Sequence, residues 1–121
     1  MHLFQRQVID KNTVITLEIQ SLDGTNAERV TRNLAVAMRG EDRVVLDLGA
    51  LRYFDVSGFA AILQWATRDR EWPDVRLCSQ SGTVQALFEL LGANTAIPLF
   101  QSREEAIASF RRMTMSHHAG V

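Results

Sequence analysis

The chain has 121 residues, of which 46% are hydrophobic and 22% charged, and its formal net charge is −1. This is the length of one ordinary domain, and the composition is typical of a soluble globular protein. A net charge near zero gives no electrostatic reason to expect binding to nucleic acid or to an anionic membrane. The apolar runs are too short for membrane insertion, and we expect no secretory leader. One cysteine, Cys78, excludes an internal disulfide and fits a reducing cytoplasm.

The first residues predict a β-hairpin. Phe4–Ile9 and Val14–Ile19 are rich in residues that favour strands, β-branched ones above all in the second run. Asp10 and Asn12 stand between the two runs and suit a tight turn.

A helix is predicted next. Thr25 and Glu28 have the T-x-x-E spacing of a capping box, in which each side chain satisfies a backbone N–H group. Gly40 stands where this helix should end. The residues that fall on one helical face are Val30, Leu34, Ala37 and Met38.

The second half alternates strands with helices. The run RVVLDLG (43–49) is almost continuously apolar, as a strand buried on both faces requires. After a turn over 52–58, helical spacing appears in Phe59, Ile62, Leu63 and Ala66. The short run VRLC predicts another strand, and the next helical face, closed by Gly92, contains Val84, Leu87, Phe88 and Leu91.

The last strand and helix follow. The strand lies around AIPLF, where Pro98 removes a hydrogen-bond donor and indicates an edge position. Ser102 and Glu105 form a second capping box at the start of a closing helix, which buries Ile107 and Phe110.

The order β-β-α-β-α-β-α-β-α predicts a single α/β domain over residues 1–112, with a mixed, mostly parallel sheet and four helices. Residues 113–121 are expected to form a flexible tail. Functional loops of such sheets lie at the carboxyl ends of the strands, and the turn over 52–58 lies there.

Catalytic and cofactor chemistry finds little support. The sequence has no G-x-G-x-x-G and no Walker loop, so we expect no nucleotide cofactor. Cys78 lies in a predicted strand and is interpreted as a small buried hydrophobe. The three histidines lie near the chain ends, where no preorganised catalytic or metal shell is expected: His2, His117 and His118.

Ser57 is not predicted to be a hydrolase nucleophile. DVSGF is not the G-x-S-x-G elbow, and no histidine in the ordered part of the chain could act as its base. Asp23 and Asp55 could pair as acid and base, but aspartates in turns commonly bond their own backbone, and we favour that interpretation. We therefore predict no enzyme, no metal and no cofactor.

Two interpretations of Ser57 stay open from the residues alone. In the structural one, Asp55 or Ser57 caps the helix and Gly58 lets the backbone turn. In the functional one, the same helix start holds a phosphate on Ser57, because unpaired N–H groups and a partial positive charge gather there. Flanking apolar residues that face solvent would then form a docking patch, the candidates being Phe54, Val56 and Phe59.

The chain resembles the STAS domain family, in particular the bacterial anti-sigma factor antagonists, from about Val8 to Arg111. The resemblance is carried by LEIQSLDGTNAERV, by VVLDLGALRYFDVSGFAAIL, where the family has a strand, D-S-S-G and a helix, and by LFELLGANTAIPLFQSREEAIASF. Two positions depart from the family pattern. Val56 replaces the first serine of D-S-S-G, and Gln20 replaces a common glycine.

The resemblance implies a regulatory binding module. Ser57 matches the phosphoacceptor serine. The unphosphorylated domain would bind an anti-sigma factor that is also a GHKL-type serine kinase, and a PP2C-type phosphatase would restore the serine. The residues expected to bind the partner are Asp23, Phe54, Asp55, Val56, Ser57, Gly58 and Phe59.

Two other functions remain as alternatives. One is a STAS accessory subunit of a stress-signalling assembly or of a lipid-transport ABC system, which binds its partner without phosphorylation. The other is a sensor that binds a small molecule or nucleotide with the same loops.

Overall fold

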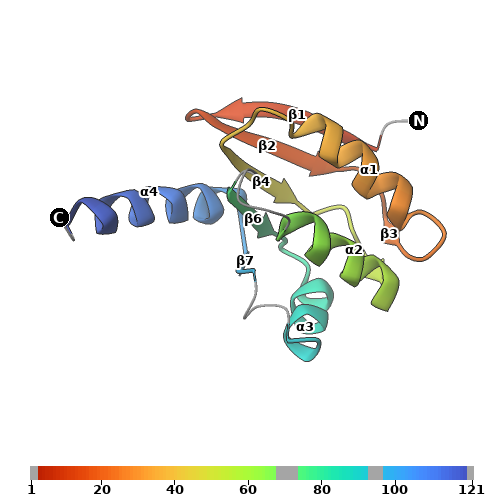
Figure 1. The fold of residues 1–121 in the computed structure, drawn as a ribbon. Coiled ribbons are helices and arrows are strands. Elements are labelled where there is room, and N and C mark those ends of the chain that lie inside the picture. Colours follow the sequence, from red (N-terminus) through yellow and green to blue (C-terminus); the bar gives the residue numbers. More distant parts are fainter. Residues whose placement is uncertain (1–2, 68–73, 93–96, 120–121) are drawn as a thin grey trace.

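The computed structural model describes residues 3–67, 74–92 and 97–119, with side chains described as far as residue 111. A five-stranded sheet has the order β1-β2-β4-β6-β7, and a second sheet pairs the two short strands β3 and β5 (Figure 1). The predicted α/β fold with a mostly parallel sheet is confirmed. The strands are β1 (Phe4–Ile9), β2 (Asn12–Leu17), β3 (Ser21–Leu22), β4 (Arg43–Asp47), β5 (Tyr53–Phe54), β6 (Asp74–Cys78) and β7 (Leu99–Phe100). The helices are α1 (Ala27–Ala37), α2 (Val56–Ala66), α3 (Gly82–Leu90) and α4 (Arg103–Ala119).

The hairpin β1–β2 is antiparallel, and the remaining pairs in the large sheet are parallel. Its loop consists of Asp10 and Lys11, whose φ angles of 50° and 67° fit the primed turns of two-residue hairpins. Asn12 is therefore not in the turn but begins β2, two residues before the predicted start at Val14. Strand β7, which follows Pro98, lies at the edge of the sheet, as predicted.

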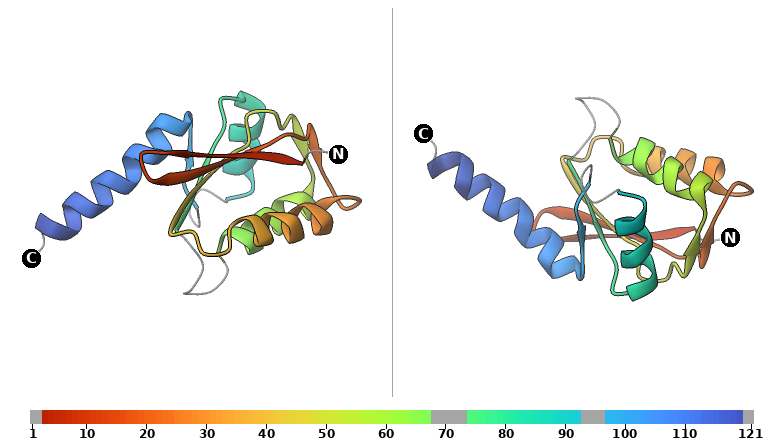
Figure 2. Two further views of the ribbon diagram at one scale, coloured as in Figure 1. Left: turned by 90° about the horizontal axis from the view of Figure 1, so that it is seen from above. Right: turned by 90° about the horizontal axis from the view of Figure 1, so that it is seen from below.

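The sheet has a core on each face because successive side chains of a strand point in opposite directions. On one face, α1, α2 and α3 cover the larger cluster, which includes Ile15, Leu17, Val44, Leu46, Val75 and Leu77. On the other face, α4 covers a smaller cluster of Val14, Val45, Cys78, Ala106, Ile107 and Phe110. Figure 2 shows α1 and α2 side by side on their face of the sheet.

The predicted capping box at the start of α1 is wrong. The helix begins after Asn26, and the Thr25 hydroxyl donates to Asp23 Oδ1 at 2.5 Å instead of capping. Glu28 forms an ion pair with Arg32 at 2.7 Å, one helical turn further on. Asp23 thus accepts the Thr25 N–H, which Glu28 would accept in a capping box. The expected end is confirmed, since α1 stops at Ala37, shortly before Gly40 with φ +84°.

Helix α4 begins as predicted only in part. Ser102 Oγ accepts the N–H of Glu105 at 3.1 Å, but Glu105 Oε2 accepts the N–H of Gln101, not that of Ser102. Arg103 then fastens the helix to the sheet, because Nη2 donates to Asp47 Oδ2 at 2.7 Å and to Thr16 Oγ1 at 3.1 Å.

The backbone of α4 stays helical to Ala119, which includes most of the segment expected to be a flexible tail, and it projects past the sheet (Figure 1). The flexibility of residues 113–121 stays a prediction.

Candidate partner-binding site

The small sheet β3–β5 brings two distant loops together. Ser21 pairs with Tyr53 and Leu22 with Phe54 in parallel register. The loop after β3 and the loop after β5 therefore leave the same edge, side by side. The turn that contains Asp23 thus lies next to the start of α2.

Asp55 is the cap of α2. Its Oδ1 accepts the N–H of Gly58 at 2.9 Å, and its backbone is extended, as at most helix N-caps. Ser57 is then the second residue of the helix, with an exposed side chain whose hydroxyl makes no hydrogen bond within the described part of the chain. The backbone N–H groups of Val56 and Ser57 belong to the first turn, where no helical carbonyl can accept them. The site therefore presents a free hydroxyl at a helix start.

Gly58 is required for close packing, not for a turn. Its φ is not in the left-handed region, which corrects the expectation that it lets the backbone turn. A Cβ at this position would lie 2.1 Å from the carbonyl oxygen of Leu22. Helix α2 can therefore rest directly on the backbone of β3, which fixes the height of Ser57 above the sheet.

The turn after β3 is held by its own side chains. Asp23 Oδ1 accepts the N–H of Thr25 at 2.9 Å, and Asn26 Nδ2 donates to the carbonyl of Ser21 at 2.9 Å. The hydrogen bonds from Thr25 lower the pKa of Asp23. A Cβ on Gly24 would lie 3.6 Å from Ser57 Oγ, so this turn lies close to the serine.

The surface around Ser57 is only partly the apolar patch that the sequence predicts. Val56 is 70% exposed, but Phe54 is 4% exposed and Gly58 is buried, so neither of the latter offers surface to a partner. Phe59 is half-buried against the core. The sequence analysis missed Tyr53, which is 53% exposed. No periodic pattern marks it in the sequence, because β5 has only two residues.

Three aromatic rings pack against one another at the start of α2 and support it. The Phe54 ring centroid lies 6.3 Å from that of Phe59 and 5.6 Å from that of Phe88, and Phe59 and Phe88 are 5.9 Å apart. They come from β5, α2 and α3, respectively. The Phe54–Phe59 pair is stacked and the two pairs with Phe88 are edge-to-face, and aromatic pairs of both kinds stabilise by more than the area they bury. Phe54 and Phe59, which the sequence analysis expected to contact the partner, therefore mainly support the start of α2.

Other residues that the sequence analysis singled out have structural surroundings or lie outside the described side chains. Cys78 is buried in β6, as interpreted from the sequence, and burial raises the pKa of its thiol to about 12. Gln20, one of the two departures from the family pattern, accepts the N–H groups of Arg52 and Tyr53 with its backbone carbonyl. His2, His117 and His118 fall outside the residues whose side chains are described.

Among the described residues, no group of three or more histidine, cysteine, aspartate or glutamate side chains is placed to hold a metal ion. Within the same ranges, no helix is both long enough and apolar enough to span a bilayer.

Known protein families and proteins include relatives of this chain. The sequence model of the STAS domain matches residues 4–106. The chain is 36% identical over 92 residues to BtrV of Bordetella bronchiseptica, described as a candidate anti-sigma factor antagonist, and the match covers 74% of this chain and 79% of BtrV.

Two solved structures share the fold. One is an anti-sigma factor antagonist of Mycobacterium paratuberculosis, with a TM-score of 0.78, 14% identity and coverage of 89% of this chain and 92% of that one. The other is the Bacillus cell fate determinant SpoIIAA in its phosphorylated form, with a TM-score of 0.58, 23% identity and coverage of 88% and 98%.

A family match over most of the chain is decisive: this protein belongs to the STAS domain family. Its sequence relationship to BtrV connects it, within that family, with the anti-sigma factor antagonists. The resemblance stated from the sequence is thereby confirmed.

Proposed function

We propose that this protein is an anti-sigma factor antagonist switched off by phosphorylation of Ser57. In its unphosphorylated form it binds an anti-sigma factor that is also a GHKL-type serine kinase, and the sigma factor is released. The observation that carries the proposal is the exposed, unbonded hydroxyl of Ser57 on the first turn of α2. SpoIIAA, which shares the fold, has been solved in a phosphorylated form.

The switch requires two partner enzymes, a kinase and a phosphatase. The kinase transfers the γ-phosphoryl group of ATP to Ser57 Oγ, which loses its proton, and ADP leaves. A PP2C-type phosphatase hydrolyses the ester with water and restores the hydroxyl. Because both enzymes must reach the oxygen, exposure is the first requirement, and Ser57 meets it.

Charge explains how the switch would act. A phosphoserine adds about −1.5 to −2 charges at neutral pH. Two carboxylates, Asp23 and Asp55, already lie in the adjoining turn and cap. The added charge therefore joins two existing carboxylates and is presented to the partner, where desolvation and like-charge repulsion oppose docking. The exposed side chains of Val56 and Tyr53 supply the apolar contact that the charge disrupts.

The test compares variants at one position. Ser57→Asp should weaken binding to the proposed GHKL-type partner kinase by at least about tenfold, and Ser57→Ala should preserve it. Isothermal titration calorimetry measures both. Thr83→Asp is a matched control, because Thr83 is the exposed second residue of α3, and its binding should not change.

A second measurement tests the modification itself. After incubation with the kinase and ATP, mass spectrometry of the peptide containing residues 52–66 should show one phosphate on Ser57. If Ser57→Asp and Ser57→Ala bind alike and no phosphate appears, the protein is instead a constitutive binding subunit.

A further inference from the structure

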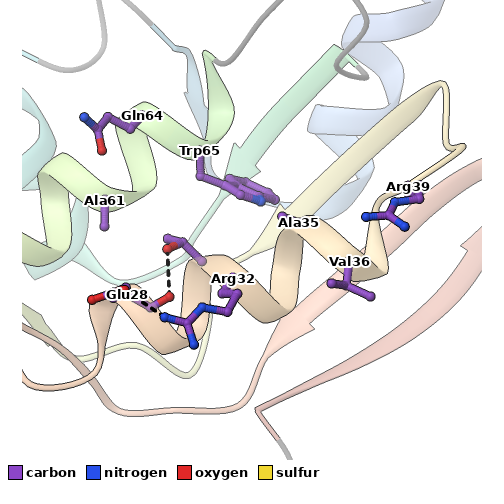
Figure 3. A pocket seen from close by; sticks show the side chains of 9 residues that line it. Glu28, Arg32, Ala35, Val36, Arg39, Ala61, Gln64 and Trp65 are labelled. Carbon is purple, nitrogen blue, oxygen red and sulfur yellow. Dashed lines mark hydrogen bonds and ion pairs between the residues drawn. The ribbon is translucent and has the colours of Figure 1, made fainter.

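A groove of about 710 Å³ runs between α1 and α2 (Figure 3). It is lined by Glu28, Thr31, Arg32, Ala35, Val36, Arg39, Ala61, Gln64 and Trp65. Ala35 and Ala61 are small, so the two helices leave open space between them. The Trp65 ring points from α2 toward α1 and forms an apolar wall, and Val36 adds an exposed apolar side chain. The groove is thus open to solvent and lined by both apolar and polar side chains.

The side chains that line the groove carry more positive than negative charge. Glu28 and Arg32 form an ion pair at 2.7 Å near one end, and both side chains are well exposed. Such a pair contributes little to stability, so Arg32 can exchange its partner at small cost. Arg39 lies at the other end and makes no ion pair among the described residues. The lining therefore carries two cations and one anion, in a chain whose net charge is −1.

The groove is continuous with the site around Ser57. Ser57, Ala61 and Gln64 are spaced i, i+4 and i+7 and so lie on one stripe of α2. The turn with Gly24, which lies close to Ser57, leads directly into α1, whose first turn contains Glu28. A partner that covers Ser57 and extends along α2 would therefore enter the groove.

We propose that the anti-sigma factor lays an acidic amphipathic helix along the α1–α2 groove. The inference rests on the proposed function, since it names the chemistry of that partner's surface. Arg32 lies on α1, and Arg39 follows two residues after its end, so the two cations lie at different places along the groove. Carboxylates about two turns apart on a partner helix can approach both cations, and an apolar side chain between them enters the space beside Trp65 and Val36. The groove then determines which kinase is bound, and Ser57 determines when.

Charge reversal tests the proposal. Arg39→Glu should weaken binding of the unphosphorylated protein to the kinase at least about fivefold at about 0.05 M salt, and less than about twofold at about 0.5 M, because salt screens rim charges. Arg29→Glu is the matched control. Arg29 is exposed on α1 but does not line the groove, and the affinity of this variant for the kinase should change little. Circular dichroism verifies that both variants are folded.

The outcomes separate the two proposals. If Arg39→Glu and Arg29→Glu bind alike while Ser57→Asp weakens binding, the groove is not the docking surface and the switch stands. If Arg39→Glu weakens binding but Ser57→Asp does not, the groove stands and the switch fails. If Arg39→Glu instead changes the sedimentation of the protein alone, the groove is occupied by a second copy of the chain, and the inference is overturned.

Discussion

Ser57 and Gly58 are neighbours in the chain with opposite surroundings. The Ser57 side chain faces solvent, whereas Gly58 is buried against the carbonyl of Leu22. Gly58 is needed for close packing and not for an unusual backbone angle. Its packing partner, Leu22, is distant in the sequence, so the sequence could indicate only that a glycine matters here. The structure shows that it sets the contact between α2 and β3.

Gly58→Ala should therefore destabilise the protein by about 1–3 kcal/mol, the usual cost of forcing a methyl group into a packed site. Urea unfolding measures the change. Gly82→Ala is the control, because nothing lies within 4 Å of a Cβ there and its φ is not left-handed. It should leave stability unchanged or raise it slightly. Equal effects of the two variants would contradict the close contact at Gly58.

Helix α2 shows which parts of an element can be predicted. The spacing of Phe59 and Ile62 indicates the buried face correctly, because burial repeats with the helical period. The exact start is harder to predict, since Asp55 and Ser57 are both good caps. The hydrogen bond from the Gly58 N–H to Asp55 Oδ1 assigns the cap to Asp55.

The cap makes a prediction at the scale of the helix. Asp55→Ala should lower the free energy of unfolding by about 1 kcal/mol, because it exposes an N–H group without a partner. Ser57→Ala should change it by less than about 0.5 kcal/mol, since its hydroxyl has no bond to lose. Thermal unfolding of the two variants measures this order, and the reverse order would assign the cap to Ser57.

The strand pair β3–β5 and the start of α1 mark the limit of the sequence analysis. Strands of two residues carry too few side chains for a periodic pattern, so neither β3 nor β5 could be predicted. At Thr25, two hydrogen-bonding patterns compete, and the turn formed by Asp23 wins over the capping box. The candidate site is built from these two features, which is why Tyr53 escaped notice while Ser57 did not.

At the scale of the whole molecule, Glu41 joins segments that are far apart in the chain. Thr13 of β2 donates to Glu41 Oε2 at 2.7 Å, and Arg6 of β1 donates to Oε1. Glu41 itself lies between α1 and β4. The hydrogen bond from Thr13 and then that from Arg6 lower the pKa of Glu41 below its ordinary value of 4.5.

This shift predicts acid sensitivity with a definite sign. A carboxylate with a lowered folded pKa stabilises the fold above its ordinary pKa, and the contribution is lost as pH falls through the lower folded value. Stability should therefore decline below about pH 4.5. Thr13→Val should show a smaller decline over that range, measured by urea unfolding at a series of pH values. Thr83→Val, at an exposed hydroxyl, should decline like the parent, and a parallel curve for Thr13→Val would refute the coupling.

The aromatic support beneath the loop has a consequence for timing. Phe54, Phe59 and Phe88 hold the start of α2 in place from three separate elements. In the proposed switch, the incoming phosphate consequently meets a surface that is already in its final shape. No slow rearrangement inside this protein needs to intervene, so the speed of the response depends on the two enzymes and on how fast the partners meet and part.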